Sequence, residues 1–425
     1  MNHFNFNKIL TINKFISILI IFLPVLLISG PFLSDLSITL ISIFFLYKVF
    51  RDKLFYIFNN KYFYILIFFY VYLVLNGIFN NSNSDSLRVS IFYIRFIIFV
   101  FAFAYLLKEE INLIKKIYFV FLLCFLTLIF DGYYQYFTGK NLIGYPINIV
   151  DGKRVSSFFG EELILGSYLS RFFPLFFGLA IYVNVKSNKR IFLISLLFIL
   201  IEVLIFLSGE RTAFVFLNLS AIFIILLIDK FKYLRIFTFF CSLIIIFLIS
   251  INSNSVKERM ITSTLTQMGI SNSDGNIDNQ KNKKYIFSKA HQNHYESAIR
   301  MFYENPLFGI GVRNFRIYCK DLKYYVSNEG CSTHPHNTYI QLLAEVGVVG
   351  FLFVFFIFSY IIFLSFKHLA NKIMKKNLLW SDFEICVYAC VIISLWPFAP
   401  TGNFFNNWLS IIYFYPIAFI LWKKI

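Results

Sequence analysis

The chain has 425 residues, of which 59% are hydrophobic, 21% are aromatic and only 14% are charged. A soluble domain has about 45–50% apolar and about 25% charged residues, so this composition excludes a soluble globular enzyme, a disordered chain and a small disulfide scaffold. The formal net charge is +17. On a soluble protein that charge would suggest nucleic acid, but a chain this apolar points to a membrane, and we expect no nucleic-acid partner.

Twelve apolar stretches are long enough for membrane-spanning helices, which need roughly 20 apolar residues each. Strands are shorter and alternate in polarity, so runs of this length predict helices. No cleavage site follows the first stretch, so we expect it to be retained as an anchor. The sequence predicts an all-α polytopic membrane protein with about 12 transmembrane helices and no internal repeat. The expected spans are 14–30, 32–50, 62–80, 89–107, 112–130, 162–184, 191–208, 212–228, 235–251, 337–366, 383–398 and 405–422.

The basic residues indicate the orientation of these spans, because Lys and Arg accumulate in cytoplasmic loops. With the N-terminus inside, the inner segments hold 21 of the 39 basic residues, against two in the short outer loops, Arg88 and Arg211. We therefore expect both termini in the cytoplasm. The inner segments carry +15 of the net charge and the rest of the chain +2, so the basic excess is a signal of topology.

One outer segment is far longer than the other loops and defines the expected domain organisation. Residues 252–335 are polar, with Asn, Ser, Asp and Gly clustered at 271–282, helical spacing at 295–302, and turn signals at Asn305, Pro306, Gly309 and Gly311. We expect this segment to form a cap with a helix or two between spans nine and ten. Residues 1–251 would then hold spans one to nine, and residues 336–425 spans ten to twelve.

Two of the six cysteines, Cys319 and Cys331, lie in the long outer segment. If that side of the membrane is oxidising, they are well placed to form a disulfide that fastens the chain just before His334. The other four fall inside expected spans, where a cysteine acts as a small buried side chain. These four are Cys124, Cys241, Cys386 and Cys390.

The richest polar stretch, residues 331–350, lies where the long outer segment returns to the membrane. Pro335 disfavours helix at His334 and suits a helix start, which places His336 at the beginning of span ten. A histidine there can act as a base near neutral pH, and a helix N-terminus attracts anions. The alternative is that His336 only caps the helix.

Three polar residues, Asn337, Gln341 and Glu345, recur at every fourth position and form one stripe along span ten. Gly347 and Gly350 permit close contact with another helix. The stripe is either part of a site or a packing contact. Its three members favour a site, as does the concentration of four of the six histidines in or at the end of the outer segment. These four are His291, His294, His334 and His336.

Basic residues also gather at the outer ends of the spans. Arg211 lies in a very short turn between spans seven and eight, and Arg154 lies just before span six. Arg300, Arg313 and Arg316 lie in the expected cap. Arginine is the natural planar ligand for phosphate oxygens. Together these residues predict an outer-face pocket for a multiply charged anion, although a solvated turn residue is the alternative for Arg211.

Three charged residues, Arg95, Arg171 and Glu202, fall inside expected spans. A charge within the hydrocarbon region is costly, so each needs a partner or a water-filled cavity.

Several nucleotide and metal signatures are absent from the chain. There is no D-x-D pair and no P-loop. His291 with His294, and His334 with His336, are alternative metal ligands, but no acidic or cysteine ligand with suitable spacing completes the set. We therefore expect neither a metal nor another cofactor.

The His336-Asn337 pair, followed after nine residues by Gly347-x-x-Gly350, resembles the signature of the O-antigen ligases and the related O-antigen polymerases. The last signature position is a small residue or Tyr in that family and Phe351 here. The turn at 208–213 is similar to the family's Ser-x-Arg turn, and 305–311 is similar to the segment before its histidine. The resemblance covers about 154–407.

This resemblance implies a GT-C-like membrane glycosyltransferase with a large periplasmic loop between helices nine and ten. The implied donor is a glycan on undecaprenyl diphosphate and the implied acceptor is a lipid A–core sugar or a growing glycan, at the periplasmic face of the bacterial inner membrane. His336 and Asn337 are the implied catalytic residues. Arg211 and Arg154 are expected to bind the diphosphate. The family has a second arginine in the large loop that is not evident here, and either His291 or Arg300 is expected to take its place.

Other functions remain alternatives at this point. A polymerase of the same family joins repeat units on the lipid carrier, and a protein O-glycosyltransferase belongs to the same group. A transporter or flippase of lipid-linked glycans is an alternative from a different class. Such folds show repeats and polar sites at the midplane of the membrane, whereas the polar residues here crowd one face.

Overall fold

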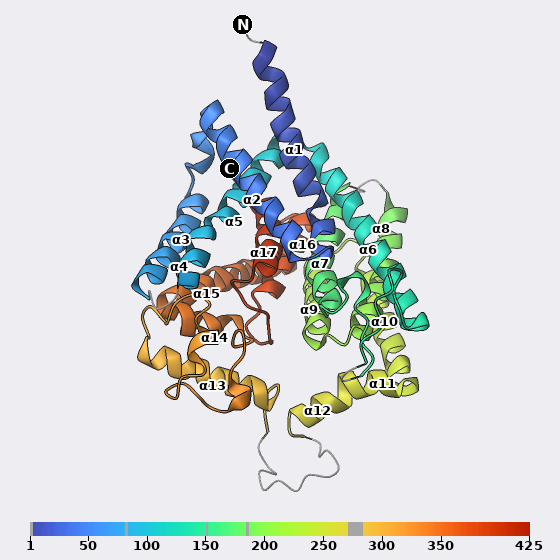
Figure 1. Cartoon of the computed structure of the whole chain (residues 1–425). Coiled ribbons are helices and arrows are strands. Elements are labelled where there is room, and N and C mark those ends of the chain that lie inside the picture. Colours follow the sequence, from blue (N-terminus) through green and yellow to red (C-terminus); the bar gives the residue numbers. More distant parts are fainter. Residues whose placement is uncertain (1–2, 81–83, 150–151, 184–186, 271–283) are drawn as a thin grey trace.

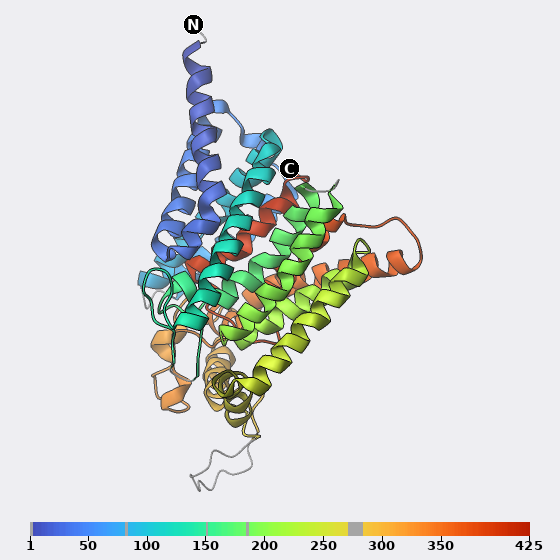
Figure 2. The ribbon, with the colours of Figure 1, turned by 90° about the vertical axis from the view of Figure 1, so that its right-hand side faces the viewer.

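The computed structural model of the chain describes residues 3–80, 84–149, 152–183, 187–270 and 284–425. Across these ranges the regular structure is helical, and β-pairing is confined to two isolated bridges, Lys140 with Pro146 and Asn148 with Arg154. Figures 1 and 2 show a body of long helices with both chain termini toward one end and the segment from α11 to α14 at the other. The predicted all-α polytopic membrane fold is confirmed.

A helix lies at each of the twelve expected spans, with the fourth span divided in two. The helices are α1 (His3–Ile28), α2 (Pro31–Asp52), α3 (Lys61–Phe79), α4 (Ser84–Phe92), α5 (Ile94–Glu109), α6 (Asn112–Thr138), α7 (Leu165–Val183), α8 (Asn188–Leu207), α9 (Arg211–Leu227), α10 (Lys232–Asn252), α15 (Thr338–Ile373), α16 (Asp382–Ser394) and α17 (Asn407–Leu421).

Not all of these helices are long enough to establish a crossing. Within the described ranges, eight are long and apolar enough to span a membrane, counting Asp85–Glu109 as one. The apolar part of α1 (Ile12–Ile28), α9 and α17 are shorter, and α16 has 13 residues. The count of twelve crossings therefore stays a prediction, as does the orientation of the termini.

Local sequence signals set several helix boundaries. Pro31 occupies the first turn of α2, where its missing N–H costs nothing. The Asn60 side chain caps α3 by accepting hydrogen bonds from the N–H groups of Tyr62 and Phe63. Gly139, at φ 83°, ends α6 in the left-handed conformation that glycine tolerates. Helix α6 thus continues eight residues beyond the expected end at 130.

The charged residues inside the spans have the partners that lipid requires. Arg95 on α5 forms an ion pair of 2.7 Å with Asp35 on α2. Glu202 on α8 accepts a hydrogen bond of 2.5 Å from the Ser242 hydroxyl on α10. Arg171 on α7 donates to the Ser167 hydroxyl one turn earlier. The expectation that each needs a partner is confirmed for these three side chains.

The segment after α10 contains several short helices; we call it the cap, and its status as a separate domain stays a prediction. Its helices are α11 (Asn254–Lys257), the π-helix η3 (Glu258–Thr262), α12 (Ser263–Gln267), α13 (Lys289–Glu304), α14 (Phe315–Tyr318) and the 3₁₀ turn η4 (Asn328–Gly330); two further 3₁₀ turns, η1 (Phe55–Phe58) and η2 (Ser157–Phe159), lie elsewhere. Helix α13 contains the predicted 295–302, whereas the polar cluster at 271–282 lies outside the described residues.

A small core of its own stabilises the cap. Ala298 and Met301 of α13 pack with Phe315 and with Ala344 of α15. A disulfide joins Cys319 to Cys331, with their Cα atoms 5.1 Å apart. This bridge closes the loop that leads into the segment 331–337. Of the four other cysteines, Cys124, Cys386 and Cys390 are buried and Cys241 is half-buried.

Helix α15 differs from the continuous helix that the sequence predicts. It continues to Ile373, and Gly347 inside it has φ 62° and ψ −171°, which interrupts the helix between residues 346 and 348. The apolar run does not reveal the interruption, because both parts are hydrophobic. The polar stripe therefore lies only on the short first part, at the end of α15 that contacts the cap.

Candidate functional site

Four histidine rings meet where the cap contacts the start of α15. The centroid of the His336 ring lies 4.1 Å from that of His334, 5.2 Å from that of His294 and 5.5 Å from that of His291. His334 and His336 come from the segment before α15, and His291 and His294 from one face of α13. The structure thus brings together two pairs of residues that are about forty positions apart in the sequence.

His336 is the most available ring of this cluster. Its side chain is half-buried, and its φ of 59° turns the backbone sharply just before α15. Left-handed backbone is uncommon for a residue other than glycine and marks a position held by its surroundings. Among the described residues its ring nitrogens have no hydrogen-bond partner, whereas those of His334 and His291 do.

The segment between α16 and α17 holds the two histidines of the 331–337 segment. The Thr401 N–H donates to the His336 carbonyl at 2.8 Å. The His334 Nε2 lies 3.1 Å from the Thr401 carbonyl. Since a carbonyl only accepts, Nε2 carries the proton of neutral His334, and Nδ1 accepts from the Thr333 hydroxyl at 2.9 Å.

The two histidines of α13 are held differently. Ser288 caps α13: its hydroxyl accepts the His291 N–H at 3.1 Å and lies 2.6 Å from His291 Nδ1. The His294 ring is 7% exposed and stacks on His336. Its Nδ1 is buried without a hydrogen-bond partner within the described part of the chain.

Burial keeps these rings unprotonated. Desolvation, together with the smaller effect of the neighbouring histidines, lowers the pKa of His336 to about 3. Desolvation likewise lowers the pKa of His334 and of His291 to about 4. An imidazole without a proton on one nitrogen is the form that accepts a proton from a substrate. At neutral pH the whole cluster is therefore in the basic form.

The polar stripe of α15 is fully occupied by contacts that fix the site. Asn337 caps the helix, with its side-chain oxygen accepting from Tyr339 and Ile340, and its amide donating to the Pro397 carbonyl at 2.8 Å. Gln341 donates to Asn403 at 3.0 Å. The stripe thus joins α15 to the 397–405 segment that holds the histidines. The predicted catalytic role of Asn337, in orienting His336 and the start of α15, stays a prediction.

Glu345 continues the same network toward the cap. Its side chain is 0% exposed, and one carboxylate oxygen accepts from Gln341 Nε2 at 2.8 Å. The other accepts from the Phe315 N–H at 3.2 Å. A buried carboxylate is tolerated where hydrogen bonds satisfy it. Glu345 therefore secures the cap loop against the first part of α15.

The two glycine motifs of the chain form one structural unit. At the interruption of α15, the N–H groups of Ile310 and Gly311 donate to the carbonyls of Ala344 and Glu345, both at 2.9 Å. The Val348 N–H donates to the Pro306 carbonyl at 2.8 Å. The loop 305–311 thus replaces the hydrogen bonds that the helix loses.

Glycine is required where these two backbones meet. A Cβ at Gly347 would lie 2.3 Å from the Leu307 carbonyl oxygen, and one at Gly309 would lie 2.5 Å from the Glu345 carbonyl carbon. A Cβ at Gly350 would lie 2.4 Å from the Val346 side chain. Close backbone contact between a loop and a broken helix, rather than helix-to-helix packing, is thus the role of Gly347.

Arg211 lies at the start of α9, in the short turn that the sequence singled out. Its guanidinium donates to the Gln267 side chain at 2.6 Å and to the Arg259 carbonyl at 2.9 Å. Arg154 donates to the Ser208 carbonyl of the same turn at 3.1 Å. Arg211 and Arg154 therefore meet at one turn, and the anion pocket expected there stays a prediction.

Two further residues, Arg259 and Glu210, contact or belong to this turn and were not predicted from the sequence. Arg259, on the π-helix η3, donates to the Gly209 carbonyl at 3.3 Å. The Glu210 carboxylate accepts the N–H groups of Gly166 and Ser167 at 2.6 and 2.9 Å, at the start of α7. Burial raises the pKa of Glu210 to about 7. In the sequence, Arg259 is visible as a basic residue soon after span nine, and Glu210 as an acidic residue next to Arg211.

The arginine turn and the histidine cluster lie close enough to interact, since the charge of Arg211 contributes to the lowered pKa of His291. Arg300, further along α13, instead pairs with Glu296 at 2.6 Å and donates to the Tyr325 carbonyl at 2.7 Å. Of the two alternatives for the second diphosphate-binding residue of the loop, His291 is the one in ring contact with His336. In the described ranges no group of three His, Cys, Asp or Glu side chains is arranged to hold a metal ion.

Fold and site together define an all-helical, multi-pass membrane protein with histidines and arginines gathered under a cap at one end of the helical body. Residues 194–355 match the family model described as O-antigen ligase. The match runs from α8 into α15 and includes Arg211, the cap and His336. No curated protein matches the chain. The family match and the apolar helices indicate a multi-pass bacterial membrane protein.

Proposed function

We propose that this protein transfers a glycan from undecaprenyl diphosphate to a hydroxyl group of a lipid A–core sugar at the periplasmic face of the inner membrane. The observation that carries the proposal is the position of His336. It lies at the start of α15 within the matched domain, beside three other histidines and facing the cap. The family match supports ligase- or polymerase-type transfer in general, and the donor and acceptor are part of the proposal.

The reaction is an inverting displacement. The oxygen of the acceptor hydroxyl attacks the anomeric carbon of the donor sugar and forms the new glycosidic bond. The bond from that carbon to the diphosphate oxygen breaks, and undecaprenyl diphosphate leaves with the electron pair. His336 takes the proton of the acceptor hydroxyl as general base.

The surroundings of His336 suit this role in two ways. Because its pKa is lowered to about 3, the ring is unprotonated at neutral pH before substrate binds. The imidazolium that forms during transfer is poorly solvated, and the negative charge of a nearby diphosphate would stabilise it. The base is thus most effective when the donor is in place.

Arginine side chains balance the charge that develops on the leaving diphosphate. Arg211 and Arg154 meet at one turn. His291 contacts the His336 ring, and the charge of Arg211 helps to lower the pKa of His291. Arg300 is the alternative to His291. Donors already aimed at developing charge lower the barrier most. The proposal assigns this work to protein groups and invokes no metal.

Asn337, Gln341, Glu345 and His334 act as positioning residues in this proposal. Their hydrogen bonds fix the start of α15, the 397–405 segment and the cap loop relative to one another. Displacing a catalytic group by about 1 Å costs up to about 10²-fold in rate. Their substitution should therefore lower transfer without removing it.

A gel of the glycolipids from a deletion strain tests the proposal against its nearest alternative. Loss of a ligase leaves full-length polymer on undecaprenyl diphosphate and bare lipid A–core. Loss of a polymerase of the same family instead leaves core capped with one repeat unit, and this pattern would contradict the proposed acceptor. Movement of labelled lipid-linked glycan in liposomes without a covalent product would favour a flippase.

A further inference from the structure

A polar cavity on the cap side of the body is lined by no residue of the arginine turn at 208–211. It has a volume of about 110 Å³, and its lining includes Arg88 of α4, Arg95 of α5, Arg313 of the cap loop and Asn407 of α17. No charged residue of the proposed diphosphate subsite contributes to it. Three arginines in one cavity need an account, because like charges repel and a buried charge needs a partner.

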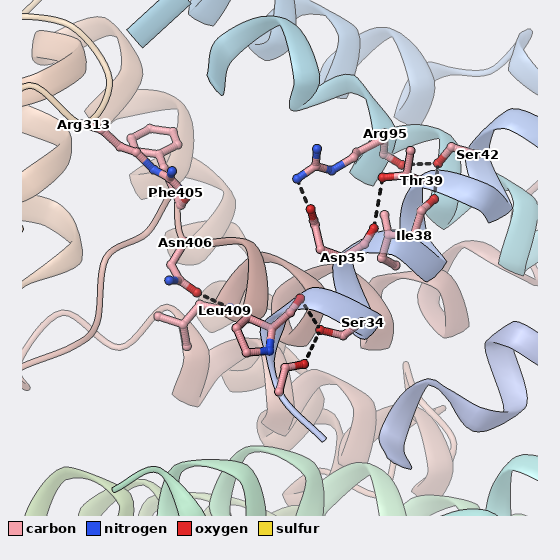
Figure 3. Close-up of polar contacts among 12 residues, drawn as sticks. Ser34, Asp35, Ile38, Thr39, Ser42, Arg95, Arg313, Phe405, Asn406 and Leu409 are labelled. Atoms are coloured by element: carbon pink, nitrogen blue, oxygen red, sulfur yellow. Dashed lines mark hydrogen bonds and ion pairs between the residues drawn. The ribbon is translucent and has the colours of Figure 1, made fainter. Parts of the chain in front are cut away.

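The arginines of this cavity have unused hydrogen-bond donors. One guanidinium nitrogen of Arg95 donates a hydrogen bond to the Asp35 carboxylate, and one of Arg313 donates to the Phe405 carbonyl. The Nε atoms of both are buried without a partner among the described residues. Figure 3 shows the two guanidinium groups on facing sides of the same space, turned toward one another. The two guanidinium groups therefore face each other with hydrogen-bond donors that the described residues do not use.

The charge around the cavity favours an anion. Asp35 is the carboxylate paired with Arg95, and Arg88, with its side chain 69% exposed at the rim, pairs with Asp85. Arg316 and Arg95 both lower the pKa of Arg313 through their positive charge, after the larger effect of burial, while Glu345 and Asp35 oppose them. Glu345 is engaged by the backbone of the cap loop. Arg95 and Arg313 thus share Asp35 as an acidic neighbour.

Exposed apolar side chains at the rim of the cavity indicate that the anion belongs to a molecule with an apolar part. Phe92 lines the cavity and is 56% exposed, and Ile91 beside it is 43% exposed. Both lie on α4, within the apolar stretch Asp85–Glu109 that is long enough to cross a membrane. A polar cavity with an apolar lip suits an amphipathic molecule, whose tail covers the lip while its head enters the cavity.

We propose that this cavity binds a phosphate group on the headgroup of a membrane lipid, clamped between Arg95 and Arg313. Arginine forks bind phosphate oxygens through paired, charge-assisted hydrogen bonds. The segment 401–407 links this cavity to the histidine cluster: Thr401 holds His334, and Phe405 accepts from Arg313. A lipid bound here is placed to serve as the acceptor, an interpretation that rests on the proposed function, whereas the binding itself does not.

The test measures binding to the full chain in an uncharged detergent by calorimetry. The probes are dioctanoyl phosphatidic acid, inorganic phosphate and uncharged dioctanoylglycerol. Phosphatidic acid should bind most tightly, because it supplies both the anion and the tail. Equal affinity for inorganic phosphate would overturn the lipid assignment, and equal affinity for dioctanoylglycerol would overturn the arginine clamp.

Charge variants of the cavity should change the affinity for phosphatidic acid in opposite directions. Arg313→Gln should weaken phosphatidic acid binding about tenfold, the loss expected for one hydrogen bond to a charged group. Asp35→Asn removes the competing carboxylate and should tighten binding several-fold. Lys320→Gln removes an exposed charge of the cap and is the matched control, with no change expected.

Two further variants secure the interpretation. Arg95→Gln leaves Asp35 without its partner, so the double variant Asp35→Asn with Arg95→Gln replaces it if the single variant does not fold. The double variant should bind about tenfold more weakly than Asp35→Asn alone. Arg211→Gln should leave phosphatidic acid affinity within about twofold. A large loss in Arg211→Gln, or unchanged affinity in both Arg313→Gln and Asp35→Asn, would overturn the proposal whatever the outcome for glycan transfer.

Discussion

The two parts of α15 on either side of Gly347 are built for different surroundings. In the first part, Gln341 and Glu345 are 0% exposed and bind both the cap loop and the 397–405 segment. In the second part, Phe356, Phe363 and Phe366 are each at least 60% exposed, as expected for side chains that face lipid. Both parts are apolar in sequence, yet only the first has a built polar network.

The interruption between these parts explains why the site can exist at a membrane face. A straight helix would offer no free carbonyls to the cap, whereas the break at Gly347 exposes those of Ala344, Glu345 and Val346. The loop 305–311 and Tyr72 of α3 take them up. Non-helical backbone at membrane depth is tolerated where protein satisfies it. The cap is thereby fixed to the same short helix that begins beside His336.

Substitution at the interruption should have the largest effect on the fold. Gly347→Ala places a Cβ 2.3 Å from the Leu307 carbonyl oxygen at a φ of 62°, so we expect little folded protein on size-exclusion chromatography. Gly144→Ala is the matched control, because its φ is 94° but nothing lies within 4 Å of the new Cβ. It should cost only the backbone strain, about 1–2 kcal/mol. Equal yields of both variants would contradict the packing role of Gly347.

Removal of the buried carboxylate of the first part should have the next largest effect. Glu345→Ala leaves the Phe315 N–H and the Gln341 amide without their acceptor, at a cost of about 1–3 kcal/mol for each buried group. In the second part, Ser365→Ala removes a hydroxyl whose one hydrogen bond within the described residues is to the Ile361 carbonyl of its own helix, so it should be nearly neutral. Thermal unfolding in detergent compares the two, and similar melting temperatures would remove the distinction between the parts.

Acid should destabilise the site end of α15 by a smaller amount. The pKa values of His336 and His334 are lowered to about 3 and about 4, whereas an unfolded histidine titrates near 6.5. Between about pH 6.5 and 4 the unfolded chain therefore binds more protons, and stability falls as the pH falls. We expect the melting temperature of the wild type to drop over this range more steeply than that of His334→Gln. A parallel drop in both proteins would show that His334 is not buried in its neutral form.

Much of the helical body follows from hydrophobicity, because a run of about 20 apolar residues has few other stable forms in a membrane. Helix ends were harder to predict. The residues 367–373 that extend α15 are partly charged and contribute nothing to an apolar run. The division of the fourth span at Tyr93 and the break at Gly347 also escaped prediction, because tertiary contacts supply the hydrogen bonds lost there.

The candidate site shows the same limit. His336, Arg211 and the histidine pair of α13 carry side-chain signals that a sequence displays. Thr401 contributes its backbone N–H and carbonyl, and Arg259 its carbonyl to Arg211. Every residue has these backbone groups, so their use in a site has no signature in the sequence.

The most direct test of the account is glycan transfer by His336→Ala in a reconstituted assay, measured together with donor binding. If His336 is the general base, transfer should fall by about 10²–10⁴-fold, while the donor, held by the arginine turn, should bind within about threefold of its wild-type affinity. Full transfer by His336→Ala would contradict the account.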